Sequence, residues 1–143
     1  MTVEFTVPGT PVGKGRPRFA SRGKYVQTYT PEKTRNYEAW VKQCWADSGN
    51  QKLSGEIWVF ITARFPIPKS ASKKARAEML EGKVWYGKRP DIDNVAKCVT
   101  DPLIGLAYDD DNQITLLHVE KVYSDTPCVH VKLVEREAKT CEP

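Results

Sequence analysis

Apolar and polar positions alternate in four stretches of the chain, and this period of two residues is typical of strands with one buried face. The pattern predicts strands at residues 3–7, 56–65, 114–123 and 128–133. The inward positions would be Val3, Phe5, Val7, Ile57, Val59, Ile61, Ala63, Phe65, Leu117, Val119, Tyr123, Val129, Val131 and Leu133. Trp58 and Phe60 fall on the nominally outer face, so we expect a helix or a second subunit to cover them.

Apolar residues between Pro31 and Gly49 recur three or four positions apart, which is the spacing of a helix with one buried face. Thr30 is suited to the N-cap, Pro31 to the first helical position and Gly49 to the end of the helix. The buried face would carry Tyr37, Trp40, Val41, Cys44 and Trp45. For the two tryptophans this spacing favours a core role over stacking on bases.

A second helix is expected to begin at Asp91 or Asp93 and to bend or end at Pro102, because proline removes a backbone donor. Residues 70–81 favour a short, highly charged helix that touches little of the core. Residues 9–30 are rich in glycine, proline and basic residues, which predicts a long loop or a loosely paired hairpin. The buried side of the second helix would carry Val95, Cys98 and Val99.

The order strand, helix, strand, short helix, helix, strand, strand predicts an α+β fold, with a small mixed or antiparallel sheet and helices packed on one face. With 143 residues, of which 40% are hydrophobic, the chain is the size of one domain, residues 1–143. No apolar run reaches the roughly 18 residues that cross a bilayer, and no secretory signal is visible. We therefore expect a cytoplasmic protein without a membrane partner. The four cysteines lie far apart without a CxxC pair, which favours buried or idle thiols over a zinc knuckle.

The net charge of +4 hides an uneven distribution of charged residues along the chain. Basic residues dominate residues 14–24 and 69–89, whereas acidic residues gather between Asp91 and Asp111. Lysine and arginine neutralise phosphates, so the basic stretches favour a nucleic-acid partner, although a solubilising loop would also explain the first stretch. The candidate DNA contacts from these stretches are Lys14, Arg16, Arg18, Lys88 and Arg89.

Asp91 and Asp93 stand two residues apart at the expected helix start, and Lys97 follows Asp93 by four. Residues four apart share a helix face, and at about 100° per residue this face lies nearly opposite Val95. Asp93 and Lys97 would therefore point to a cleft or to solvent. The run Asp109-Asp110-Asp111 precedes a strand, and from there one carboxylate would return to the same cleft.

Three carboxylates without a nearby histidine or cysteine form a hard oxygen site, which suits Mg²⁺, or Mn²⁺, better than zinc. Such an ion promotes phosphodiester hydrolysis, and an adjacent lysine stabilises the same transition state. A structural reading stays open for each group: Asp91 as an N-cap, Asp93 with Lys97 as a surface ion pair, and the aspartate run as a solvated turn. Asn94 would cap the helix or touch the substrate. An acidic centre flanked by basic segments nevertheless favours a phosphodiesterase.

The segment Arg89-Pro-Asp-Ile-Asp-Asn-Val-Ala-Lys97, followed by Asp110-Asp111-Asn-Gln-Ile114, resembles the RusA family of Holliday junction resolvases. Gly13-Lys-Gly-Arg-Pro-Arg18 and Tyr29-Thr-Pro-Glu-Lys-Thr-Arg35 are similar to segments of its phage and prophage members. Together these matches span most of the chain, and the two acidic motifs are fairly specific in combination.

The resemblance implies a RusA-like crossover junction endodeoxyribonuclease. Such a protein is a homodimer that nicks four-way (Holliday) junctions with Mg²⁺, in recombination and repair within a bacterial or phage-infected cell. Asp91, Asp93 and Asp111 would hold the metal and Lys97 would be the catalytic lysine, with Asp110 as an alternative to Asp111. Similar members act on branched DNA generally, so the substrate range stays open. Two other functions also stay open: a non-catalytic protein that binds DNA junctions, and a hydrolase of small phosphate esters.

Overall fold

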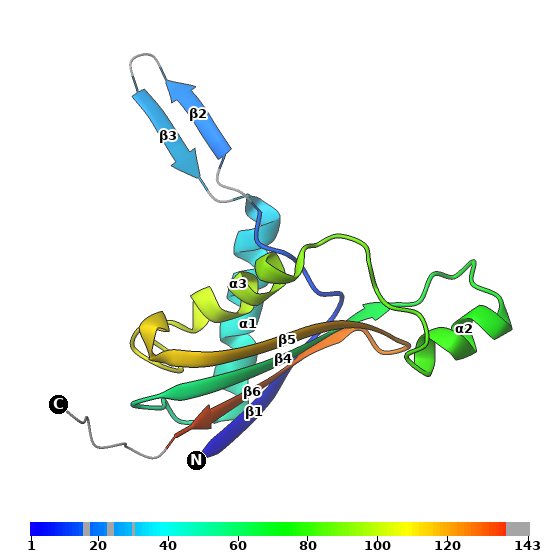
Figure 1. Ribbon diagram of the computed structural model, residues 1–143. Helices are drawn as coiled ribbons and strands as arrows, with labels where there is room; N and C mark the ends of the chain where they lie inside the picture. Colours follow the sequence, from blue (N-terminus) through cyan, green and yellow to red (C-terminus); the bar gives the residue numbers. More distant parts are fainter. Residues whose placement is uncertain (16–17, 23–24, 30, 137–143) are drawn as a thin grey trace.

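The structure is a computed structural model that describes residues 1–15, 18–22, 25–29 and 31–136, with residues 18–22 and 25–29 described by their backbone. A four-stranded sheet has the order β1-β6-β4-β5 (Figure 1). Strands β4 and β5 run parallel, while β1 with β6 and β4 with β6 run antiparallel. The mixed sheet of the predicted α+β fold is therefore confirmed. Its strands are β1 (Thr2–Pro8), β4 (Ile57–Pro66), β5 (Ile114–Ser124) and β6 (Cys128–Glu135).

Two helices, α1 (Glu32–Ser48) and α3 (Ile92–Leu103), contact each other and cover one face of this sheet. Every second residue of β1 and β4 is buried against them, as the alternating pattern predicts. The core formed in this way also takes the inward positions of β6, and burial of its apolar area is the main force that holds helices and sheet together. The largest fully buried side chains of this core include Tyr108, Phe65, Leu53, Ile57, Ile61, Leu103 and Leu133.

Strand β5 is an edge strand, and its register decides which of its side chains face α3. Leu117, Val119 and Lys121 are paired with Val59, Ile61 and Ala63, so they share the face of those buried residues. The predicted common side of Leu117, Val119 and Tyr123 is thus confirmed. Leu117 is nevertheless 48% exposed, because β5 is the last strand on this side of the sheet in the described part of the chain.

The opposite face of the sheet carries Trp58 and Phe60, which are half-buried. The guanidinium of Arg136 lies 3.9 Å from the centre of the Trp58 ring, and the ammonium of Lys132 lies 5.8 Å from that of Phe60. Among the described residues, cationic side chains rather than a helix are thus recorded against these rings. A second subunit over this face stays a prediction.

Helix α1 differs from the sequence prediction at two points. Pro31 occupies the N-cap position and Glu32 begins the helix, so placing Pro31 at the first helical position was wrong by one residue. Thr30 lies outside the described residues. Trp40 was expected in the core but is 41% exposed, because its indole N–H donates to the carbonyl of Pro8 (2.8 Å) and holds the ring at the sheet edge. Gly49 ends the helix in a left-handed conformation (φ 71°), as expected.

Two smaller elements extend from this body (Figure 1). Helix α2 (Lys73–Leu80) begins at Ser72, whose hydroxyl accepts a hydrogen bond from the backbone of Ala75, and buries none of its residues. Strands β2 (Arg18–Arg22) and β3 (Tyr25–Tyr29) pair with each other in a separate two-stranded sheet, which confirms the predicted hairpin. Cys44, Cys98 and Cys128 are buried free thiols, as expected, and Cys141 lies outside the described residues. In the described ranges, no helix has both the length and the apolarity to span a membrane.

Candidate active site

The start of α3 presents the central residues of the predicted site. Asp91 occupies the N-cap position, but its side chain makes no capping hydrogen bond. Asp93 and Lys97 are exposed, whereas Val95 is buried on the other side of the helix, as the helical spacing predicts. Within the described chain, no ion pair joins Asp93 to Lys97 and no hydrogen bond uses the Asp91 carboxylate. These charges therefore do not serve the local helix in the way that a cap or a surface ion pair would.

The loop that leads into α3 is held by one of its own side chains, Tyr86, and by Lys121 from the sheet. The ring of Tyr86 stacks on Phe65 with centroids 4.0 Å apart, and its hydroxyl donates to the carbonyl of Arg89 (3.0 Å). The ammonium of Lys121, from β5, donates to the carbonyls of Lys88 and Pro90, each at 2.9 Å. Three hydrogen bonds to successive parts of residues 88–90 thus determine where the backbone enters the helix at Asp91.

Residues 11–15 run across the same helix and hold it from another side. The backbone of Lys14 donates to the carbonyl of Asn94 (2.9 Å). Gly13 packs so tightly that a Cβ atom there would clash with the Cβ of Pro90. Only glycine fits at this contact, which explains why the segment can lie directly on the loop before Asp91.

The side chain of Lys14 binds two carboxylates of the protein itself. Its ammonium donates to the carboxylate of Asp101 (2.5 Å) and lies 3.6 Å from Glu38. Partial burial by itself would lower the pKa of Lys14, but the hydrogen bond and charge of Asp101, followed by Glu38, raise it above its usual value. A DNA contact by Lys14 stays a prediction, and its charge already has two carboxylate partners.

The aspartate run, residues 109–111, lies in the segment between α3 and β5. Asp109 forms an ion pair with Lys52. The carboxylate of Asp110 accepts from the backbone of Asn112 (3.1 Å) and caps the short 3-10 helix η1 (Asp111–Gln113). The solvated-turn reading is therefore correct for Asp109 and Asp110.

Neither Asp110 nor Asp111 has a basic partner among the described residues, and the carboxyl group of Asp111 does not cap η1. Its pKa is raised, chiefly by a side-chain hydrogen bond with Asp110 and further by the negative charges of Asp110 and Asp101. The pKa of Asp110 is lowered, first by the backbone N–H of Asn112 that it accepts. A group of carboxylates that favours retention of a proton is one that a cation would also stabilise.

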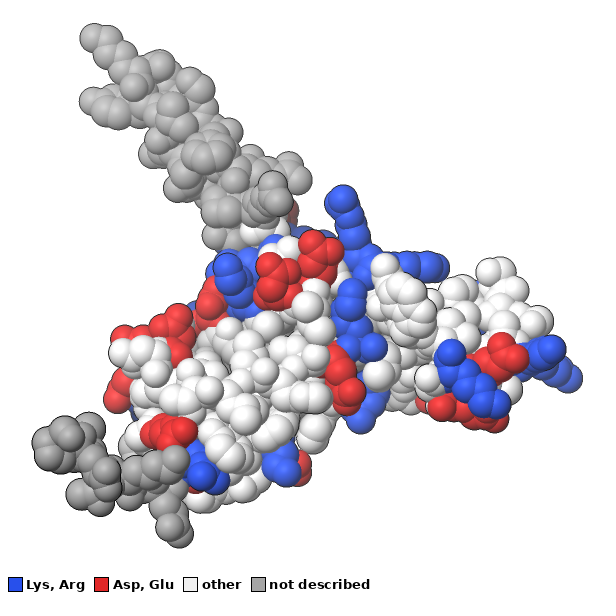
Figure 2. Space-filling view, in the orientation of Figure 1, with Lys and Arg blue, Asp and Glu red and all other residues white. Residues whose placement is uncertain are grey.

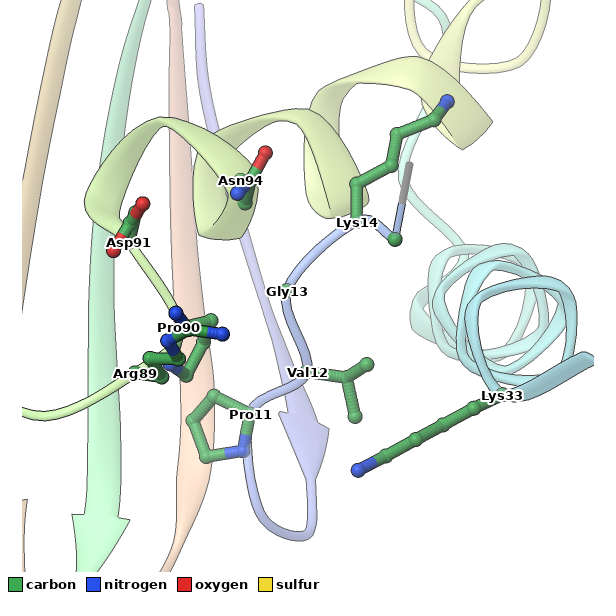
Figure 3. Close-up of a pocket in the computed structure, with 10 residues that line it drawn as sticks. Pro11, Val12, Gly13, Lys14, Lys33, Arg89, Pro90, Asp91 and Asn94 are labelled. Carbon is green, nitrogen blue, oxygen red and sulfur yellow. The ribbon is translucent and has the colours of Figure 1, made fainter. Parts of the chain in front are cut away.

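A pocket of about 670 Å³ adjoins the start of α3 (Figure 3). Polar and charged groups from three segments of the chain meet there, and Figure 2 shows acidic side chains next to Lys and Arg side chains over the same part of the body. The lining residues are Pro11, Val12, Gly13, Lys14, Gly15, Lys33, Arg89, Pro90, Asp91 and Asn94.

The structure thus brings together Asp91, Asn94 and Arg89 of the predicted site, and it adds Lys33, which sequence reasoning missed. Lys88 lies in the loop held by Lys121, while Arg16 and the side chain of Arg18 lie outside the described residues. Among described residues, no three His, Cys, Asp or Glu side chains form a ready-made metal site. The joint metal site of Asp91, Asp93 and Asp111 stays a prediction.

Comparison with known proteins identifies the family. The profile of the family described as Endodeoxyribonuclease RusA matches residues 8–134, nearly the whole chain. The chain belongs to the RusA family. The chain is also similar to a Bacillus subtilis (strain 168) protein described as "Uncharacterized protein YqaN". The two are 34% identical over 139 residues, which cover 95% of this chain and 98% of the relative.

Membership of the RusA family supports endonuclease activity on DNA, and with it DNA binding. The start of α3 carries groups that are suited to such a nuclease: exposed aspartates and a pocket lined by cationic side chains. The resemblance noted from the sequence motifs is confirmed at the level of the family.

Proposed function

We propose that this RusA-family protein is a Mg²⁺-dependent endonuclease that cuts four-way junctions or related branched DNA in recombination and repair. The observation that carries the proposal is the start of α3. There, Asp91 is exposed at the N-cap and lines a pocket with cationic groups, while Asp93 and Lys97 are exposed on the side of the helix opposite the buried Val95. Exposed carboxylates alone would repel DNA, whereas neighbouring lysine and arginine side chains attract its phosphates.

The donor atoms fit a hard cation. Asp91, Asp93 and Asp111 would hold Mg²⁺, with Mn²⁺ as the alternative, because carboxylate oxygens are the ligands that both ions prefer. The carboxylate of Asp110 is occupied in capping η1, which supports the choice of Asp111 over Asp110. When bound, the ion supplies a more acidic water molecule and balances charge on the reacting phosphate.

Lys97 has the position of a group that acts on the substrate. It lies one helical turn after Asp93, is exposed, and has no carboxylate partner among the described residues. Its ammonium would therefore be free to stabilise negative charge that develops on the phosphoryl oxygens. The loop contacts of Tyr86 and Lys121 would keep the neighbouring Asp91 in place during this step.

A homodimer would explain how branched DNA is chosen over linear duplex. Two identical sites at a fixed separation match the symmetry of a four-way junction, and phosphate contacts would set the position of the DNA without reading its bases. The sheet face with Trp58 and Phe60 is our candidate for the subunit interface, since it exposes apolar rings without a covering helix in the described chain. We place this activity in the cytoplasm of a bacterial or phage-infected cell.

The proposal is tested by incubating the purified protein with a synthetic four-way junction, a flap and a linear duplex of the same sequences, with and without Mg²⁺. We expect Mg²⁺-dependent nicking of the junction and slower or no nicking of the duplex. Binding of the junction without cutting in Mg²⁺ or Mn²⁺ would instead show a non-catalytic binding protein. Equal cutting of all three DNAs would remove the branched-DNA specificity and leave a general nuclease.

A further inference from the structure

The pocket beside α3 contains a cation that has no structural task in the described chain. Lys33 is the second residue of α1, and its side chain reaches toward Val12 and Pro11 on the wall of the pocket (Figure 3). Arg89 lies on the other side of the same pocket. Neither side chain forms an ion pair or a hydrogen bond with any described residue. Two cations that face one pocket repel each other, and an anion between them removes that repulsion.

The position of Lys33 on its helix is unfavourable for stability. The first turn of a helix carries the positive end of the helix dipole, where a lysine is disfavoured. Pro31 at the N-cap provides no side chain that accepts from the free backbone N–H groups. A lysine at this place is therefore not explained by the helix itself, and an anion in the pocket gives it a function.

Lys14 shows the contrast within the same pocket. Its side chain points away from Pro11 and Val12 and reaches Asp101, so its ammonium is neutralised inside the protein (Figure 3). The walls of the pocket are also fixed in advance. A Cβ atom at Gly15 would lie 2.9 Å from a ring carbon of Pro31, and the Gly15 backbone donates to the hydroxyl of Thr34 (2.9 Å). The pocket is thus formed before a ligand arrives.

We infer that this pocket binds a phosphate of the DNA strand adjacent to the phosphate that is cut, and that Lys33 is the residue that binds it together with Arg89. This inference rests on the proposed function. Asp91 lines the same pocket, so a strand whose reacting phosphate lies at Asp91 and Asp93 brings a neighbouring phosphate between Lys33 and Arg89. A contact of this kind positions the strand and is independent of base sequence.

The test compares Lys33→Ala and Lys33→Glu with Lys42→Glu. Lys42 is exposed on the same helix, and at about 100° per residue it points to the opposite side from Lys33. Affinity for a synthetic four-way junction is measured in Mg²⁺-free buffer at several salt concentrations. For Lys33→Ala we expect weaker binding to every junction sequence and a log–log salt slope that is shallower by about 1. Lys42→Glu should keep the wild-type slope.

Thermal unfolding separates this role from a structural one. Lys33→Glu should unfold at the wild-type temperature or above it, because a carboxylate suits the first helical turn, while it binds the junction more weakly than Lys33→Ala. Equal salt slopes for wild type and Lys33→Ala would overturn the assignment of the pocket and leave the proposed function intact. A wild-type protein that binds no junction at all would overturn both.

Discussion

The two ends of α3 carry acidic residues in opposite surroundings. Near its C-terminus, Asp101 stands where the helix dipole disfavours a negative charge, and Lys14 compensates with a 2.5 Å hydrogen bond. At the N-terminus, Asp91 and Asp93 stand where the dipole favours them, and no described side chain pairs with either. The paired end therefore contributes to the fold. The unpaired end keeps charges that are available to a metal ion and a substrate.

The strongest effect is expected at the unpaired end. Asp93→Asn should lower the rate of junction cutting by about 1,000-fold, since it removes a carboxylate ligand of the proposed ion that balances charge on the reacting phosphate. Junction binding in Mg²⁺-free buffer should persist. Gel assays of cutting and binding measure both quantities, with Asp125→Asn in the exposed turn between β5 and β6 as the matched control. Cutting at the wild-type rate by Asp93→Asn would show that the site lies elsewhere.

Lys97→Ala comes next. We expect cutting to fall by about 100-fold, because one charged donor to the transition state is lost. The melting temperature should stay close to that of the wild type, since Lys97 is exposed and unpaired among the described residues. A loss of stability that parallels the loss of activity would assign Lys97 to the fold.

Lys121→Met tests whether the hydrogen bonds of Lys121 hold the loop that leads to Asp91 at the unpaired end of α3. Without hydrogen bonds to the carbonyls of Lys88 and Pro90, the loop before Asp91 should shift, and kcat should fall by about tenfold with little change in junction affinity. Lys121→Arg keeps the donors and should recover most of the activity. Single-turnover kinetics measure kcat and affinity separately. If Lys121→Arg is as impaired as Lys121→Met, the hydrogen bonds are not the reason for the loss.

The smallest effect on activity is expected at the paired end. Lys14→Met should leave kcat within a few-fold of wild type but lower the free energy of unfolding by about 1 kcal/mol, as for a partly exposed ion pair. The folded pKa of Lys14 lies above 10.5, so this contribution is fully present below pH 10.5 and is lost as pH rises through the raised pKa. Urea unfolding at pH 8 and above pH 10.5 measures the difference. Identical stabilities at pH 8 would contradict a stabilising pair.

Local sequence patterns were sufficient to predict the strands of the four-stranded sheet and the exposure of Asp93 and Lys97 on α3. Alternation in β4 and β6 reflects one buried side, and it holds because the sheet is covered on that side. The four-residue spacing of Asp93 and Lys97 required only helical geometry, and the structure shows both residues exposed opposite Val95. These properties depend on neighbours within one element, which is why they are visible in the sequence.

The remaining features depend on contacts between distant segments. Lys14 and Asp101 are 87 positions apart, and Lys121 meets the carbonyl of Pro90 across 31 positions, so no local pattern connects them. Nothing in the sequence distinguishes Lys33 from an ordinary solvent-exposed lysine on a helix. Trp40 was misplaced because helical spacing alone does not reveal its hydrogen bond to Pro8 at the sheet edge. For Lys121 the sequence did hold a signal: alternation places this lysine on the inward face of its strand, between Val119 and Tyr123, where a charged side chain needs a partner.

The central claim is that carboxylates from α3 and from the segment before β5 share one divalent cation. Mn²⁺ binding, followed by electron paramagnetic resonance, tests it directly in wild type, Asp91→Asn, Asp93→Asn, Asp111→Asn and the Asp125→Asn control. We predict that each of the first three substitutions weakens Mn²⁺ binding by about tenfold or more, while Asp125→Asn binds like wild type. Wild-type affinity in Asp111→Asn would contradict the shared site.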